Sequence, residues 1–466
     1  MSGKQLYALI GLLFIMGFTL SAGAQVLTLK EAVGTGLQHY GAIRAKAHYV
    51  DASRAGVELS RKEYLPDLTL SFQQDYGTVN GATGPLYGLR GLAVASSGMA
   101  LESQNWHSAF GALYLANVNW EFFSFGRARQ KINVSKAVLA RDESDLQQEQ
   151  FQHGIRVAAA YLNLLAAQRL TISWQKNLDR ATALQEVVVV RARNGLNAGV
   201  DSSFANAEVS NAKMALTRSR DTEQERANLL ARLMGVAAQD FVLDSLFLSR
   251  IPSHYLDTAG EAQQLHPLLG WYQRRIDWSN QQAGYFKTFN WPTFSLFSVF
   301  QGRGTGFDHD YGIVDLEGYS GDYFKGVKPI RSNYLVGIGM VWNITSPLRV
   351  REQVSAQQFI SKGLQAEYEL ADQTLKAQLV LADQKIRNAT DNYREVPVQM
   401  KAASDAYLQK SVLYRNGLAT IVEVTQALYA LNRAETDRDI AYNNVWQALL
   451  LKAAASGDAN LFMNEF

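Results

Sequence analysis

The chain of 466 residues contains no cysteine. Disulfide bonds and thiolate metal sites are therefore excluded, and a protein exported to an oxidising compartment can simply avoid this residue. An excess of charge is also absent, because 45 Lys and Arg stand against 43 Asp and Glu. This balance excludes the basic footprint of a nucleic-acid-binding protein. The seven histidines show no metal-ligand spacing, so we expect neither a cofactor nor enzyme activity.

Long apolar runs are absent after the first residues of the chain. Lys4 precedes an apolar run at residues 6–20, and the small residues Ala22 and Ala24 follow it. This order is typical of a secretory signal peptide, residues 1–24, with cleavage before Gln25. The alternative is an N-terminal membrane anchor. No later run is long enough for a membrane-spanning helix, so we expect an exported protein without one.

The first half of the mature chain, residues 25–245, alternates between helical and strand patterns. A helix is expected from about 29 to 64, where Pro66 stops it. Apolar residues then fall on even positions in two segments, about 67–76 and 106–123, which predicts strands. Aromatic residues at both ends of the second apolar face suit a strand between lipid and water. A strand of a soluble sandwich is the alternative.

A helical pattern without proline follows at residues 127–193. Such a helix is roughly 100 Å long, which predicts a coiled-coil-like element. Asn194-Gly195-Leu196 interrupts it, because Asn and Gly tolerate the left-handed conformation that ends helices. Asp201, Ser202 and Ser203 offer N-caps for a further helix at 201–235.

Residues 246–456 repeat this order, so the sequence contains an internal duplication of one large unit. Arg-Asn-Gly-Leu occurs at 193–196 and again at 415–418, His266 matches His39, and Pro292 matches Pro66. The second repeat predicts strands at about 293–301 and 334–345 and helices at 349–415 and 421–452, with a C-terminal tail at 457–466. Pro397 lies inside the second long helix and should kink it.

Two hairpins give four lipid-facing strands, whose open edges are very costly in a membrane. Closure therefore needs further copies of the chain. Two copies give eight strands, a barrel filled by its own side chains. Three copies give a 12-stranded barrel with an open lumen, continued by a tube of long helices. We therefore expect a membrane α+β fold: a trimeric β-barrel with four strands per chain and an α-helical coiled-coil barrel.

These features resemble the TolC family of outer-membrane efflux proteins. The resemblance rests on the signal peptide, the duplication, the Trp-x-x-Phe-x-x-Gly entry into the first long helix, and the tip motif. It implies a homotrimer in the outer membrane of a Gram-negative bacterium that extends into the periplasm. It also implies a periplasmic adaptor protein and an inner-membrane pump as partners. The expected function is the exit duct of a tripartite efflux system for small molecules such as drugs. The alternatives are the exit duct of a type I protein secretion system and a non-conducting coiled-coil scaffold.

The resemblance also assigns candidate site residues. The tip turns expected to contact the adaptor are Asn194, Gly195, Leu196, Asn416, Gly417 and Leu418. The expected tip gate comprises Asp201, Tyr414, Glu423 and Gln426. The Asn-Gly pairs could instead only terminate helices, and Asp201 and Glu423 could be solvated helix caps rather than parts of acidic rings. The gate departs from the family, since Gln426 replaces an acid and Ala419 replaces an arginine, which predicts a weakly locked tip. The barrel's expected aromatic belt comprises Trp106, Trp120, Tyr334 and Trp342.

Overall fold

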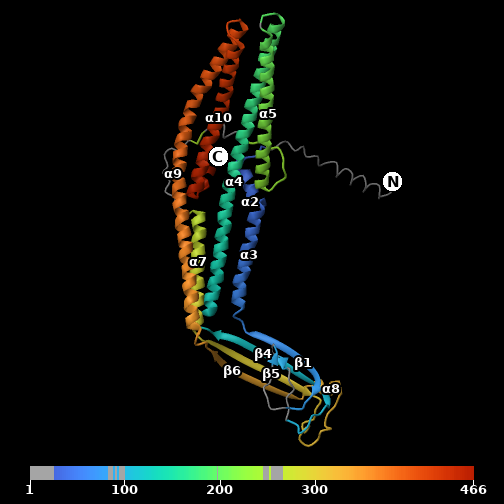
Figure 1. Cartoon of the computed structure of the whole chain (residues 1–466). Helices are drawn as coiled ribbons and strands as arrows, with labels where there is room; N and C mark the ends of the chain where they lie inside the picture. Colours follow the sequence, from blue (N-terminus) through green and yellow to red (C-terminus); the bar gives the residue numbers. More distant parts are fainter. Residues whose placement is uncertain are drawn as a thin grey trace, which may run out of the picture. The chain divides into compact units, whose positions relative to one another are not determined.

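Figure 1 shows the computed structural model of the protein, which describes residues 26–81, 88–89, 92–93, 100–196, 198–244, 251–252 and 266–465. The expected signal peptide lies outside these residues. The described chain forms two compact units. We call residues 51–140 and 275–363 the sheet unit, and the described residues before 51, from 141 to 274 and from 364 on the helical unit. The chain passes between the units within four helices: α3 (Gly41–Lys62), α4 (Arg127–Arg193), α7 (Pro267–Lys287) and α9 (Ser346–Arg415).

The sheet unit contains one four-stranded antiparallel sheet. Its strands are β1 (Asp67–Thr78), β4 (Ser108–Phe123), β5 (Thr293–Thr305) and β6 (Arg331–Val341). Their order is β1-β4-β5-β6, so β1 and β6 are the edge strands (Figure 1). A short pair, β2 (Gly88–Leu89) and β3 (Leu92–Ala93), lies between β1 and β4 in the chain. β4 begins at Ser108, so Trp106, expected inside this strand, precedes it.

Up to a register shift between Trp120 and Phe123, the register places the even-numbered residues of the sheet on one face. Leu70 pairs with Ala116, Ala116 with Phe300, and Phe300 with Tyr334. This face is apolar and exposed within one chain, as Phe72 (71% exposed) and Tyr334 (82%) show. The odd-numbered residues form a mostly polar second face. The sheet therefore has the two-sided pattern of a strand layer between lipid and water.

The helical unit has a core where parts of both repeats meet. It contains α2 (Leu29–His39), α5 (Gly199–Met234), α10 (Ile421–Ser456) and α11 (Asn460–Met463), with the adjoining parts of α4 and α9. Residues from α4, α5, α10 and α11 are almost fully buried in this core: Tyr161, Leu164, Leu230, Trp446 and Phe462. Because side chains far apart in the sequence share this core, the unit is one folded body.

In both repeats, a glycine at the end of a helix packs closely against a histidine. Gly235 (φ 70°) and Gly457 (φ 78°) end α5 and α10 in the left-handed conformation. A Cβ atom on Gly235 would lie 2.9 Å from the carbonyl oxygen of His39, and one on Gly457 would lie 2.8 Å from the His266 ring. Only glycine fits either position, which explains why both repeats carry it.

One expectation about helices is wrong. The helix expected from about 29 to 64 is interrupted at Tyr40, which has extended backbone angles and ends α2 before α3 begins. In the expected C-terminal tail, α11 packs Phe462 edge-on against Trp446 with ring centroids 6.1 Å apart. Burial of Phe462 holds this segment in the core. Pro397 lies inside α9 without ending it. No described helix combines the length and apolar character needed to cross a membrane.

Candidate functional site: the two helix tips

The first tip turn ends α4. Gly195 has φ 73°, and its N–H donates to the carbonyl of Ala192 at 3.0 Å. The N–H of Leu196 donates to the carbonyl of Arg191 at 2.9 Å. These two bonds form a Schellman motif, in which the residue after Asn194 must be left-handed and glycine adopts that conformation without strain. The Leu196 side chain is 66% exposed.

The second tip turn, at the end of α9, has the same geometry. Gly417 has φ 77°, and its N–H donates to the carbonyl of Tyr414 at 3.0 Å. Leu418 N–H donates to the carbonyl of Leu413 at 2.8 Å. The Asn416 side-chain amide donates to a main-chain carbonyl one turn earlier at 3.0 Å. Leu418 is 74% exposed, so both turns present an apolar side chain to solvent.

Arg191 links the two turns. Its Nη1 atom donates to the carbonyl of Arg415 at 2.7 Å, and its guanidinium lies 5.5 Å from the centroid of the Tyr414 ring. The turns therefore lie at the same end of the helical unit (Figure 1). The sequence comparison did not single out Arg191, because the repeated tetrapeptide begins two residues later.

Tyr414, a predicted gate residue, is buried within its own chain. It is 3% exposed and packs with Val188, Ala205, Ile421 and Val424. This cluster joins α4, α5, α9 and α10 next to the two turns. Tyr414 therefore stabilises the tip in this structure.

Glu423 forms an ion pair with a lysine and also contacts the N-cap residue of its helix. It lies in the first turn of α10, where the Thr420 hydroxyl accepts a hydrogen bond from its N–H at 3.4 Å. Its carboxylate forms an ion pair with Lys410 of α9. This ion pair lowers the pKa of Glu423, with a smaller contribution from Thr420. Within one chain, Glu423 is thus a paired first-turn residue.

Asp201 lies in the first turn of α5, and Gln426 lies in the second turn of α10. α5 begins at Gly199 with Ala198 as its N-cap and no side-chain cap. The expectation that Asp201 or the following serines cap this helix is therefore wrong. Asp201 lies in the first turn, where a carboxylate interacts favourably with the helix dipole. Gln426 is exposed on α10.

A further contact joins the returning helices near the tip. The Tyr429 hydroxyl of α10 donates to Glu208 Oε2 of α5 at 2.5 Å. Burial, together with this hydrogen bond, raises the pKa of Tyr429 to about 12. The sequence analysis missed this pair, since neither residue belongs to the repeated motif.

Farther along the helices, α4 and α10 share a buried polar seam. Arg180 donates to both carboxylate oxygens of Glu435, at 2.9 and 2.5 Å. The Ser173 hydroxyl donates to Asp439 Oδ2 at 2.9 Å. Asn177 lies between them on α4 and is also buried. These polar residues recur every three or four positions on each helix, a signal the sequence analysis did not use.

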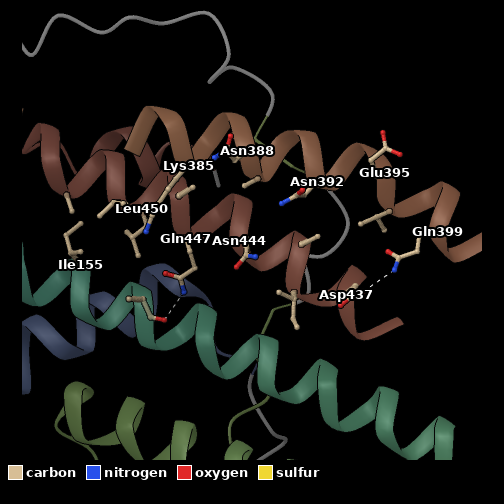
Figure 2. Close-up of a pocket in the computed structure, with 18 residues that line it drawn as sticks. Ile155, Lys385, Asn388, Asn392, Glu395, Gln399, Asp437, Asn444, Gln447 and Leu450 are labelled. Carbon is tan, nitrogen blue, oxygen red and sulfur yellow. Dashed lines mark hydrogen bonds between the residues drawn. The ribbon is translucent and has the colours of Figure 1, made fainter. Parts of the chain in front are cut away.

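A groove of about 810 Å³ lies between α4, α9 and α10. Figure 2 shows its lining, which combines amide side chains from α9 and α10 with aliphatic residues and with the charged Lys385, Glu395 and Asp437. Gln399 donates to Asp437 Oδ2 at 3.1 Å across it. Gln447 donates to Asn163 Oδ1 of α4 at 3.2 Å. Amide side chains of the lining therefore join the three helices.

The predicted belt residues lie at the two ends of the sheet. The indole N–H of Trp120 donates to the carbonyl of Tyr64 at 2.9 Å, and that of Trp342 donates to the carbonyl of Asn290 at 3.1 Å. Tyr334 lies near the other strand ends and is exposed, as is Trp106 just before β4 (79%). This distribution suits two interfacial levels.

The charged loop after β5 forms ion pairs rather than a metal centre. Lys325 lies 3.4 Å from Asp308, and His309 lies 3.8 Å from Asp310. In the described part of the chain, no group of three or more acids and histidines could hold a metal ion.

The chain matches one family model over part of its length and several solved structures over almost all of it. Residues 34–236 match the family model for outer membrane efflux proteins. No curated protein sequence matches the chain.

Several solved structures share the fold over almost the whole chain. The outer-membrane channel OprN is 18% identical, with a TM-score of 0.72, covering 93% of this chain and 90% of its own. VceC from Vibrio cholerae is 16% identical, with a TM-score of 0.69, covering 92% and 96%. The Campylobacter jejuni CmeC channel is 14% identical, with a TM-score of 0.73, covering 92% and 85%. The chain therefore has the fold of these outer-membrane channels, and residues 34–236 resemble the outer membrane efflux protein family.

Proposed function

We infer that the protein is the outer-membrane exit duct of a tripartite efflux system. One observation carries this function: the sheet has a continuous apolar face and two unpaired edge strands, β1 and β6. Open edges inside a membrane leave backbone groups unsatisfied at high cost. Other copies of the chain must therefore close the sheet, and three copies make a 12-stranded barrel wide enough for an open lumen.

The long helices would continue such a barrel as a helical tube. α4 and α9 are 67 and 70 residues long, far beyond ordinary globular helices. In a cyclic trimer of the outer membrane they would line a periplasmic tube. A duct of this kind carries its cargo without chemistry.

The tip turns are the proposed adaptor contacts. Leu196 and Leu418 are exposed apolar residues on Schellman turns that main-chain hydrogen bonds hold in place. Such apolar points suit docking of a periplasmic adaptor, with an inner-membrane pump beyond it. Asp201, Glu423 and Gln426 would lie near the duct axis and narrow it.

Photo-crosslinking at Leu196 and Leu418 in living cells tests these partners. Capture of a periplasmic adaptor from both positions is expected. A crosslinker at the exposed Lys30 of α2, outside the tip turns, is the control and should not capture the adaptor. Identification of the pump beside the adaptor distinguishes small-molecule efflux from type I protein secretion. Correctly assembled protein that captures no adaptor from either turn would overturn the docking proposal.

A further inference from the structure

Two arginines lie directly opposite each other on the polar face of the sheet. Arg303 of β5 pairs with Arg331 of β6 in the antiparallel ladder. Both numbers are odd, and no register shift interrupts the β5–β6 ladder, so both side chains share the face opposite the apolar one. Both are exposed. They lie at the strand ends next to the 306–330 loop.

This arrangement is costly without a ligand. Like charges directly opposite on neighbouring strands destabilise a sheet. No ion pair or side-chain hydrogen bond of either guanidinium occurs among the described residues. The next pair on the same face, Gln301 and Asn333, adds two neutral amides. Together these four side chains offer hydrogen-bond donors and no carboxylate.

An acid of β1 lies on the same face of the sheet. Asp75 is separated from Arg303 by β4. Its two carboxylate oxygens accept hydrogen bonds from the Gln73 amide at 3.1 and 3.0 Å. Neither arginine forms an ion pair with an acid of the described sheet.

We propose that Arg303 and Arg331, repeated in each copy of the chain, form an anion-binding ring in the lumen at the outer end of the barrel. The proposal rests on the proposed function, because only a closed barrel turns the polar face into a lumen wall. Paired guanidinium groups bind carboxylate, phosphate and sulfate groups with matched geometry. The ring would favour anions, and anionic groups on cargo, at the exit.

The test uses the purified full-length trimer in planar bilayers under a potassium chloride gradient. The R303Q/R331Q variant should lower the chloride-to-potassium permeability ratio by roughly threefold or more, since charged rings in narrow pores concentrate counter-ions. The control is K328Q, which removes one positive charge per chain, as R303Q does, from an exposed lysine in the neighbouring loop. It should leave the ratio nearly unchanged. R303Q is also measured alone. Arg303 lies on the inner strand β5, whereas Arg331 lies on the edge strand β6.

A second measurement does not need conduction. Calorimetric titration of the trimer with inorganic pyrophosphate should show binding that weakens by about tenfold in R303Q/R331Q and stays as in wild type in K328Q. Equal permeability ratios and equal pyrophosphate binding in wild type and the double variant overturn the ring and leave the duct intact. A correctly inserted wild-type trimer that carries no current overturns the duct function, and the titration then decides the ring by itself.

Discussion

Single residues set the shape of the tips. The two tip glycines adopt φ values of 73° and 77°, which a side chain makes unfavourable. G417A should therefore destabilise the trimer by about 1 kcal/mol, since its Cβ would meet only ordinary contact with Arg191 at 3.6 Å. Urea unfolding followed by circular dichroism measures this loss.

The matched control for G417A is G199A, at a glycine inside the first turn of α5 with open space around it. Alanine is the better helix former, so this change should be neutral or slightly stabilising. Equal effects of the two substitutions would contradict the assigned left-handed turn.

Lys410 pairs with the Glu423 carboxylate and lowers its pKa within one chain. The pairing lowers the Glu423 pKa below its usual 4.5, so its stabilising effect is complete above that pH and is lost as the pH falls through the lowered value. K410Q should raise the Glu423 pKa toward its usual range and free the carboxylate. Above pH 5, we expect multivalent cations to block reconstituted K410Q channels at lower concentration than wild type.

E423Q is the counterpart of K410Q. If three copies of Glu423 form a ring on the trimer axis, E423Q should weaken cation block. Block that is unchanged in both variants would leave Glu423 as a helix cap without a role in the gate.

Between helices, the α4–α10 seam depends on paired polar groups. The Glu435 side chain is only 9% exposed, and Arg180 supplies its two-pronged partner. R180A should cost about 3 kcal/mol because it leaves a buried carboxylate unpaired. The double variant R180M/E435L should be much milder, which a double-mutant cycle in urea would show.

The exposed pair Arg394–Asp391 on α9 is the control for this seam, with both side chains more than half exposed. R394A should change stability by less than about 0.5 kcal/mol. A similar small loss for R180A would mean that water reaches Glu435 and that the seam is not a dry interface.

The assembled protein offers its own test, because the chain contains no native cysteine. Ser71 of β1 combined with a cysteine scan of 331, 333, 335 and 337 on β6 should yield disulfide-linked dimers and trimers at one or two positions. Closure between β1 of one copy and β6 of the next brings those residues within disulfide reach. S71C alone is the control.

A scan without any covalent dimer or trimer, in protein from the outer-membrane fraction, would contradict barrel closure through β1 and β6. The positions that do react would also give the register between copies.

Much of the fold is readable from the sequence because it depends on local periodicity. The alternation around Leu70 and Phe300 indicates strands, and the unbroken helical pattern at 127–193 has the same bounds as α4. The Asn-Gly-Leu tetrapeptides indicate where the long helices end, because a left-handed residue is needed there. The break at Tyr40 was missed, although Gly41 directly after it disfavours helix.

Contacts between distant segments were beyond the sequence. The hydrogen bonds from Arg191 to Arg415 and from Arg180 to Glu435 each join helices far apart in the chain. The Phe462 segment likewise looked like a plain tail until its packing on Trp446 was visible.

The sequence alone determined the duplication, the alternation of strands and long helices, and the turns at the tips, because each depends on backbone preference and periodicity over a few residues. The tertiary structure decided which charges meet and which stand alone. The opposed Arg303 and Arg331 became visible only through the register of β5 and β6, because ladder pairing, not sequence spacing, sets which side chains share a rung.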